Sequence, residues 1–281
     1  MATIIDGKAI AGEINEAMRL RADQLKARGI EPCLAVVIAG DDPASVIYVR
    51  NKRRACKKVG ITSRYVKLDQ EISGDALIQE IRALNADASV HAILVQLPLP
   101  KHIDEIKALD AIDPEKDADG FHVVNAGKLL TGRASTLPCT PAACMELLKR
   151  ANVPMDGAHA VVVGRSNIVG KPISLLLQRE NCTVTMCHSR TKDLADHLRR
   201  ADIVICAAGR RGLVTADMLK PGAAVIDVGI NRSDDGKVVG DVDFERASQV
   251  AGAITPVPGG VGPMTVAMLM QNTILAAERT Q

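Results

Sequence analysis

Four residues in the first 120 positions are candidates for transferring protons or binding a polar ligand: Tyr48, Lys52, Gln96 and Asp119. A lysine can act as a general acid or base. An amide can hold that lysine or a water molecule, and a carboxylate can accept hydrogen bonds from adjacent N–H groups. Tyr48 and Lys52 are four positions apart, which on a helix places them one turn apart on the same face.

The helix that must position Lys52 is expected over residues 41–60, which have an acidic start, an early Pro43, a basic end and a terminal Gly60. Its inward stripe holds Ser45, Tyr48, Lys52, Ala55, Cys56 and Val59, and the basic Arg50, Arg53, Lys57 and Lys58 lie largely off it. Because a buried, unpaired ammonium is costly, Lys52 is expected to line a polar cleft or to be held neutral. From spacing alone, a lysine whose stem lies along the surface is equally consistent.

Gln96 and Asp119 each lie in a predicted turn. Gln96 follows the apolar run 92–95 and precedes Leu-Pro-Leu-Pro, so its amide is expected at the carboxyl end of a strand, where open α/β sheets bind ligands. A loop cap is the alternative. Asp119 lies in the acidic turn 117–120, which is not an EF-hand because Ala126 stands where the bidentate Glu is required. Its carboxylate suits a ligand with adjacent N–H donors, and a solvated turn is the alternative.

A second set of residues is of the types that bind a dinucleotide. Residues 161–172 read Val-Val-Val-Gly-Arg-Ser-Asn-Ile-Val-Gly-Lys-Pro and join a predicted strand to a predicted helix. Such a turn directs backbone N–H groups and the positive end of the helix at a pyrophosphate. Ser166 replaces the middle glycine of the standard fingerprint, and one extra residue precedes Gly170. A tight turn without a ligand is therefore the alternative.

The end of the next predicted strand favours NADP over NAD. Residues 187–190 read Cys-His-Ser-Arg, without the acidic residue that holds the ribose hydroxyls in NAD enzymes. Ser189 can donate a hydrogen bond to a 2′-phosphate, and Arg165 or Arg190 can supply positive charge. These residues could also be solvated loop positions, an interpretation that suits Arg190 better than Arg165.

The elements that carry these residues are predicted to form α/β domains. Short apolar runs at 34–39, 92–95, 160–163, 183–187, 203–207 and 224–228 alternate with helix-length amphipathic segments, as in βα units around parallel sheets. Residues from about 113 to 138 are predicted to be loop. A helix is expected to begin at a capping Thr140 with Pro141 in its first turn, and another over 264–279. The predicted domains are 1–139 plus 264–281, and 140–263.

Composition excludes several classes of protein. Among the 281 residues, 47% are hydrophobic and 24% charged, and the net charge is +2, so disorder and a polyanionic partner are not expected. Four aromatic residues are too few to stack single-stranded nucleic acid. The seven cysteines form neither a redox nor a zinc motif, so no metal is expected. Without a leader or a membrane-length apolar run, the protein is expected to be cytoplasmic, with no membrane partner.

Taken together, six motifs resemble the bifunctional methylenetetrahydrofolate dehydrogenase/methenyltetrahydrofolate cyclohydrolase family. They lie in order at residues 48–52, 96–100, 117–120, 138–141, 164–172 and 255–265. The resemblance implies two α/β domains flanking a cleft, with folate on the first, NADP on a Rossmann-like second, and a homodimer. It also implies oxidation of 5,10-methylenetetrahydrofolate, hydrolysis of the methenyl product to 10-formyltetrahydrofolate, and a place in one-carbon metabolism and purine biosynthesis.

The same resemblance implies roles for individual residues. Lys52 is the central catalytic residue, Tyr48 and Gln96 shape its surroundings, and Asp119 anchors the pterin ring. The folate site further includes Ser45, Pro98, Gly260 and Pro263, and the cofactor site consists of Gly164, Arg165, Ser166, Val169, Gly170, Ser189, Arg190 and Ile230. The alternatives are a monofunctional NADP-dependent dehydrogenase of the same plan, a dehydrogenase acting on a hydroxy acid or shikimate-like substrate, and a non-catalytic NADP-binding regulator.

Overall fold

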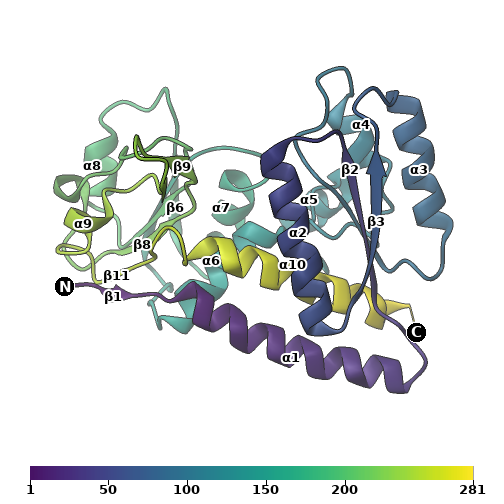
Figure 1. Ribbon diagram of the computed structural model, residues 1–281. Helices are drawn as coiled ribbons and strands as arrows, with labels where there is room; N and C mark the ends of the chain where they lie inside the picture. Colours follow the sequence, from purple (N-terminus) through teal and green to yellow (C-terminus); the bar gives the residue numbers. More distant parts are fainter. Residues whose placement is uncertain (281) are drawn as a thin grey trace. The chain divides into compact units, whose positions relative to one another are not determined.

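Two α/β units make up residues 1–280, the part of the chain that the computed structural model describes (Figure 1). The six-stranded unit comprises residues 1–11 and 138–265, and the three-stranded unit comprises residues 12–137 and the described residues from 266 to 280. The prediction placed residues 1–11 with the first domain. Instead, strand β1 (Thr3–Ile4) pairs in parallel with β11 (Ala253–Ile254) and extends the second sheet. Strands of two residues are too short to show a periodicity in the sequence.

The three-stranded unit has a parallel sheet in the order β3-β2-β4. Its strands are β2 (Cys33–Ala39), β3 (Thr62–Leu68) and β4 (Ala92–Val95), and its helices include α2 (Pro43–Val59), α3 (Gly74–Ala86), α4 (Glu105–Asp110) and α5 (Val123–Leu130). Helix α2 covers one face of the sheet and α3 the other (Figure 1). Every residue of β2 and β4 is buried, which explains their continuous apolar runs.

Two elements of this unit were absent from the prediction. Strand β3 forms the edge of the sheet and alternates exposed with partly buried residues, so it lacks an apolar run. Helix α5 lies within the stretch predicted as loop, and the His122 side chain accepts a hydrogen bond from the backbone N–H of Val124 at its start (3.1 Å). With eight residues and Gly127 in its middle, the helix is shorter than the window of about 11 to 18 residues over which a helical periodicity is recognised.

Helix α2 begins and ends as its sequence signals predict. The Asp42 carboxylate accepts a hydrogen bond from the Ser45 N–H (2.8 Å), and Gly60 is left-handed (φ 82°) and donates its N–H to the Cys56 carbonyl. The inward stripe is largely as expected, because Ser45, Cys56 and Val59 are buried and Lys52 is half-buried. Tyr48 departs from it and is 43% exposed. It lies in the second turn, close to where α2 starts beyond the carboxyl edge of the sheet.

The six-stranded unit has a fully parallel sheet in the order β1-β11-β8-β7-β5-β6. Its longer strands are β5 (His159–Val163), β6 (Thr183–Cys187), β7 (Ile203–Cys206) and β8 (Ala224–Asp227), and a short hairpin joins β9 (Asn231–Arg232) to β10 (Val238–Val239). Helices α6 (Cys139–Arg150) and α7 (Gly170–Arg179) lie on one side of the sheet, and α8 (Leu194–Leu198) and α9 (Phe244–Ala247) on the other (Figure 1).

The predicted cap of α6 was wrong. The helix begins at Cys139 after Pro138, without a side-chain cap, and the Thr140 hydroxyl lies 3.2 Å from that of Thr265. Helix α10 (Val261–Arg279) begins three residues before the expected position. Within residues 1–280, no helix combines the length and apolar character needed to cross a membrane.

Candidate active site

Lys52 and Gln96 meet at the carboxyl edge of the three-stranded sheet. Lys52 projects from the third turn of α2, and its Nζ donates a hydrogen bond to Gln96 Oε1 (3.1 Å). Gln96 directly follows β4, and its own Nε2 donates to the Leu97 carbonyl (2.7 Å). The Gln96 amide is therefore fixed with its oxygen toward the lysine. Both side chains are half-buried, so the ammonium is partly desolvated yet still has a polar partner.

Asp119 lies in the loop beside β4, and this loop runs toward the same carboxyl edge of the sheet. An isolated parallel bridge pairs Ile93 of β4 with Asp117, so residues 117–120 run in the same direction as β4 toward Gln96. Asp119 is half-buried, and no protein donor within residues 1–280 hydrogen-bonds its carboxylate. The loop thus presents one unpaired carboxylate beside the Lys52–Gln96 pair.

Asp117, rather than Asp119, holds this loop together. Its buried carboxylate accepts hydrogen bonds from the N–H groups of Gly120 (3.0 Å) and His122 (2.8 Å) and from Asn125 Nδ2 (2.9 Å). Burial raises the pKa of Asp117, and these hydrogen bonds oppose that rise. Sequence reasoning missed this role, although the spacing of Asp117 and Gly120 is typical of an aspartate that bonds the backbone of its own turn.

The remaining predicted folate residues occupy different surroundings. Ser45 is 3% exposed and Pro98 is exposed, after a cis peptide bond with Leu97. Gly260 is buried, and a Cβ on it would lie 2.6 Å from the Pro256 carbonyl oxygen. The packing of its own turn therefore requires a residue without a side chain here. Pro263 is half-buried in the first turn of α10.

The nucleotide turn lies between β5 and α7 in the six-stranded unit. Gly164 has φ 137°, and a Cβ there would lie 2.2 Å from the Ala207 carbonyl oxygen. Gly170 starts α7, where a Cβ would lie 2.3 Å from the Gly164 carbonyl oxygen. The Ser166 hydroxyl accepts hydrogen bonds from the N–H groups of Val169 (3.1 Å) and Gly170 (3.3 Å). Both glycines are required by the close backbone contacts, and Ser166 fixes the first turn of the helix.

The end of β6 lies beside this turn and carries no acidic residue. Strands β5 and β6 are parallel, with Val163 opposite Cys187, so Arg165 and Ser189 follow paired residues at one edge of the sheet. Arg165, Ser189 and Arg190 are exposed. A serine and two arginines without a carboxylate match a phosphate monoester. The donor set therefore fits NADP.

Two buried carboxylates that sequence reasoning overlooked flank the segment after β8: Asp227 ends β8, and Asp241 follows β10. Ile230 is 57% exposed and lies between Gly229, whose N–H donates to Asp227 (2.9 Å), and Asn231, whose Nδ2 donates to Asp241 (2.9 Å). Burial raises the pKa of Asp227 to about 6. The backbone N–H donors lower this pKa, and the nearby Asp241 raises it. The sequence does carry a signal for these two carboxylates, because an aspartate stands close to a glycine at a strand end in residues 227–229 and 240–241.

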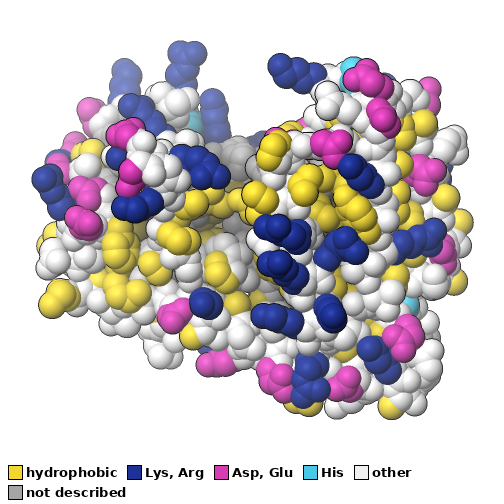
Figure 2. Space-filling view, viewed as in Figure 1, with side chains coloured by type: hydrophobic (Ala, Val, Ile, Leu, Met, Phe, Trp, Pro, Cys, Tyr) yellow, Lys and Arg dark blue, Asp and Glu magenta, His cyan; other side chains and the backbone are white. Residues whose placement is uncertain are grey.

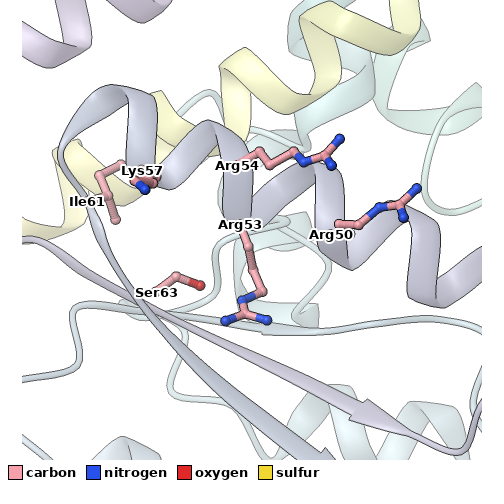
Figure 3. A pocket seen from close by; sticks show the side chains of 6 residues that line it. All are labelled: Arg50, Arg53, Arg54, Lys57, Ile61 and Ser63. Atoms are coloured by element: carbon pink, nitrogen blue, oxygen red, sulfur yellow. The ribbon is translucent and has the colours of Figure 1, made fainter.

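A hollow of about 400 Å³ lies on the other side of α2, facing β3 (Figure 3). It is lined by Arg50, Arg53, Arg54, Lys57, Ile61 and Ser63. The Arg53 guanidinium lies 4.7 Å from the centre of the Tyr65 ring. Lys and Arg side chains gather over this part of the surface (Figure 2). Because the lining includes none of the residues predicted for the folate site, the hollow is distinct from the Lys52–Gln96 pair.

Two family matches cover most of the sequence. Residues 5–119 match the family described as tetrahydrofolate dehydrogenase/cyclohydrolase, catalytic domain, and residues 138–281 match its NAD(P)-binding domain. The chain is 58% identical over 279 residues to "Bifunctional protein FolD" of Bordetella avium, covering 99% of this chain and 98% of that protein.

Solved structures of similar proteins cover the same length. The crystal structure of the bifunctional FolD methylenetetrahydrofolate dehydrogenase/cyclohydrolase from Campylobacter jejuni has a TM-score of 0.99 and 48% identity, covering 100% of both chains. The Trypanosoma brucei N5,N10-methylenetetrahydrofolate dehydrogenase-cyclohydrolase, complexed with NADP cofactor and inhibitor, has a TM-score of 0.95 and 43% identity, covering 99% of this chain and 98% of the other.

Proposed function

This chain belongs to the tetrahydrofolate dehydrogenase/cyclohydrolase family, and we propose that its Lys52 moves the protons in the second of the family's two reactions. It is a bifunctional enzyme that uses NADP. It oxidises 5,10-methylenetetrahydrofolate to the methenyl compound and hydrolyses that product to 10-formyltetrahydrofolate. The observation that carries the assignment to Lys52 is its 3.1 Å hydrogen bond to Gln96.

The oxidation depends mainly on positioning. The carbon that loses hydride lies between two folate nitrogens, which stabilise the resulting cation without an added acid or base. NADP, when bound, accepts the hydride. The protein then has to hold the substrate carbon at the right distance and angle from the nicotinamide. We assign the pterin to Asp119, because its unpaired carboxylate can accept both N–H groups of an aminopyrimidinone edge. Tyr48, Ser45, Pro98, Gly260 and Pro263 complete this folate site in the proposal.

The hydrolysis needs proton transfer, and Lys52 is the group proposed to provide it. Water attacks the methenyl carbon and gives up one proton, which leaves a hydroxyl on that carbon. The bond from the carbon to one ring nitrogen then breaks, the nitrogen takes up a proton, and the hydroxyl loses its proton as the formyl C=O forms, so that one proton is released overall. Lys52 is proposed to accept the proton that the attacking water gives up and to deliver a proton to the leaving nitrogen. Gln96, whose amide nitrogen is held by the Leu97 carbonyl, keeps its oxygen toward Lys52 and so orients the amine.

The proposed cofactor residues lie at the carboxyl edge of the six-stranded sheet. Gly164, Ser166, Val169 and Gly170 form the turn for the pyrophosphate, at the positive end of α7. Arg165, Ser189 and Arg190 are proposed to bind the 2′-phosphate, and Ile230 to contact the dinucleotide through its exposed side chain.

Three further features are proposed from the likeness to the family. We infer a homodimer, a cytoplasmic location and a contribution of the formyl product to purine biosynthesis. Sedimentation equilibrium tests the first, because a mass of 29.8 kDa at all concentrations would contradict a dimer.

One assay distinguishes the bifunctional enzyme from its alternatives. The protein is mixed with NADP and 5,10-methylenetetrahydrofolate while the absorbances of NADPH and of the methenyl compound are followed together. A bifunctional enzyme produces NADPH with only transient methenyl absorbance. Lasting methenyl accumulation would indicate a monofunctional dehydrogenase. Absence of NADPH formation would contradict the dehydrogenase assignment, and NADP binding without turnover would support a regulator.

A further inference from the structure

Two buried carboxylates in the six-stranded unit remain outside the site assigned above. Asp241 is fully buried and Asp227 is 3% exposed, yet within residues 1–280 neither forms an ion pair with a cationic side chain. A buried charge without a counter-ion is costly unless hydrogen bonds stabilise it. Here the partners are almost all backbone N–H groups of the loops at the carboxyl edge of the sheet.

Asp241 binds the loop that follows β7. Its Oδ2 accepts hydrogen bonds from the N–H groups of Ala208 (2.7 Å) and Gly209 (2.9 Å), and its Oδ1 accepts from the N–H of Arg210 (2.8 Å) and from Asn231 Nδ2 (2.9 Å). Three successive amides of one loop thus converge on a single carboxylate. Because all four donors are N–H groups, both oxygens of the Asp241 side chain act as acceptors.

Asp227 in turn fixes the segment that carries Asp241. Its oxygens accept hydrogen bonds from the N–H groups of Gly229 (2.9 Å), Asp241 (3.0 Å) and Val242 (2.9 Å). The backbone closes tightly over both carboxylates. A Cβ on Gly229 would lie 2.3 Å from Asp241 Oδ1, and one on Gly240 would lie 1.9 Å from Asp227 Oδ2. The two aspartates and two glycines therefore form one interlocked support.

This support adjoins the nucleotide turn directly. Ala207, the residue before the three amides bound by Asp241, has its carbonyl oxygen against Gly164, where a Cβ would lie only 2.2 Å away. The exposed Ile230 lies between Gly229 and Asn231, each of which donates to one of the two carboxylates. The backbone beside the turn and the segment carrying Ile230 are thus held by the same pair.

We propose that Asp241, held in place by Asp227, is a positioning residue for NADP. It fixes residues 207–210 and 229–231 as preformed walls beside the nucleotide turn, so that binding NADP does not have to order them. Asp241 is fully buried and acts through these loops. The proposal rests on the cofactor assignment made above and concerns how tightly NADP binds.

The test compares Asp241→Asn with a matched surface variant, Asp234→Asn. Both remove one negative charge, but the Asp234 side chain is 99% exposed and pairs only with Arg211 (3.2 Å). Isothermal titration with NADP gives the dissociation constant. Amide hydrogen exchange of the NADP-free protein reports residues 208–210 directly. Asparagine keeps one acceptor oxygen and turns an NH₂ group toward N–H donors, so it loses about half of the hydrogen bonds.

The expected result for Asp241→Asn is a dissociation constant raised at least about tenfold, with faster exchange at residues 208–210. The KM for NADP should rise more than kcat falls at saturating NADP. Asp234→Asn should match the wild type in every measurement. Faster exchange with an unchanged dissociation constant would overturn the proposal, as would a fall in kcat with an unchanged KM.

A milder variant decides the matter if Asp241→Asn does not fold. Asn231→Leu removes a single donor to Asp241, and it should raise the dissociation constant about two- to fivefold. An unchanged value would overturn the positioning role. Failure of the wild-type protein to bind NADP would instead contradict the cofactor assignment, so the two failures are distinguishable.

Discussion

Replacing Lys52 by Met separates the two reactions of this enzyme. Methionine keeps the length of the stem and removes the amine that donates to Gln96 Oε1 over 3.1 Å. If Lys52 transfers protons, its loss should lower cyclohydrolase kcat by about 10²- to 10⁴-fold. Hydride transfer needs no such help and should keep activity within about tenfold of the wild type, since only substrate positioning is disturbed.

A purely positional role for Lys52 predicts a different magnitude. A hydrogen bond to a charged group contributes about 1.5–3 kcal/mol, which corresponds to roughly 10- to 150-fold in rate. Such a loss would lower both activities together. Gln96→Leu removes the same hydrogen bond from the other side and so measures this positional contribution. The two variants should therefore agree in dehydrogenase activity and differ in cyclohydrolase activity.

The assay measures each reaction alone. NADPH absorbance with the methylene substrate reports oxidation, and the decay of methenyl absorbance without NADP reports hydrolysis. Lys58→Met serves as the control, because Lys58 is exposed near the end of the same helix and its loss should change neither rate. Full retention of hydrolysis by Lys52→Met would refute the reasoning, as would equal losses in both reactions that match those of Gln96→Leu.

Three further predictions concern the six-stranded unit. Ser189→Asp should raise the KM for NADP roughly thirtyfold, because a carboxylate about 4 Å from a phosphate costs on the order of 2 kcal/mol in a partly solvated site. Ser189→Asn is the control. An unchanged preference for NADP over NAD would show that the 2′-phosphate binds elsewhere. Gly164→Ala should lower the free energy of unfolding by about 2–4 kcal/mol, measured by urea denaturation, because its Cβ meets the Ala207 carbonyl. Gly157→Ala, also left-handed but in open space, should cost less, and equal costs would exclude the steric cause. The Asp227 carboxyl, whose pKa burial raises from 3.8 to about 6, should titrate near pH 6 by ¹³C NMR. Because the folded state holds this proton more tightly than the unfolded state, the group's contribution to stability should fall by about 2 kcal/mol as pH rises from 4 to 6. A titration midpoint below 4.5 contradicts this.

The prediction succeeded for elements in which one local signal determines the structure. Helix α2 has an acidic cap, an early proline and a terminal glycine, and it begins and ends where these signals place it. Strands β4 and β6 match their predicted runs residue for residue. It failed where burial follows from distant partners. Strand β3 is a polar edge, Thr140 meets Thr265 instead of capping α6, and β1 joins the second sheet through β11.

The amino-acid sequence by itself determined which residue types stand at the ends of the strands. The absence of a carboxylate after β6, the lysine on the inward stripe of α2 and the glycines of the nucleotide turn are all local features, because backbone conformation and helical spacing depend on neighbours along the chain.

Only the tertiary structure decided which of these residues meet. Lys52 and Gln96 are 44 positions apart, and their contact exists because β2 and β4 are adjacent parallel strands. The choice between Asp117 and Asp119, and the support formed by Asp227 and Asp241, likewise depended on which backbone N–H groups each carboxylate reaches. The long-range pairings among them are set by the packing of whole elements, and no spacing along the chain encodes those.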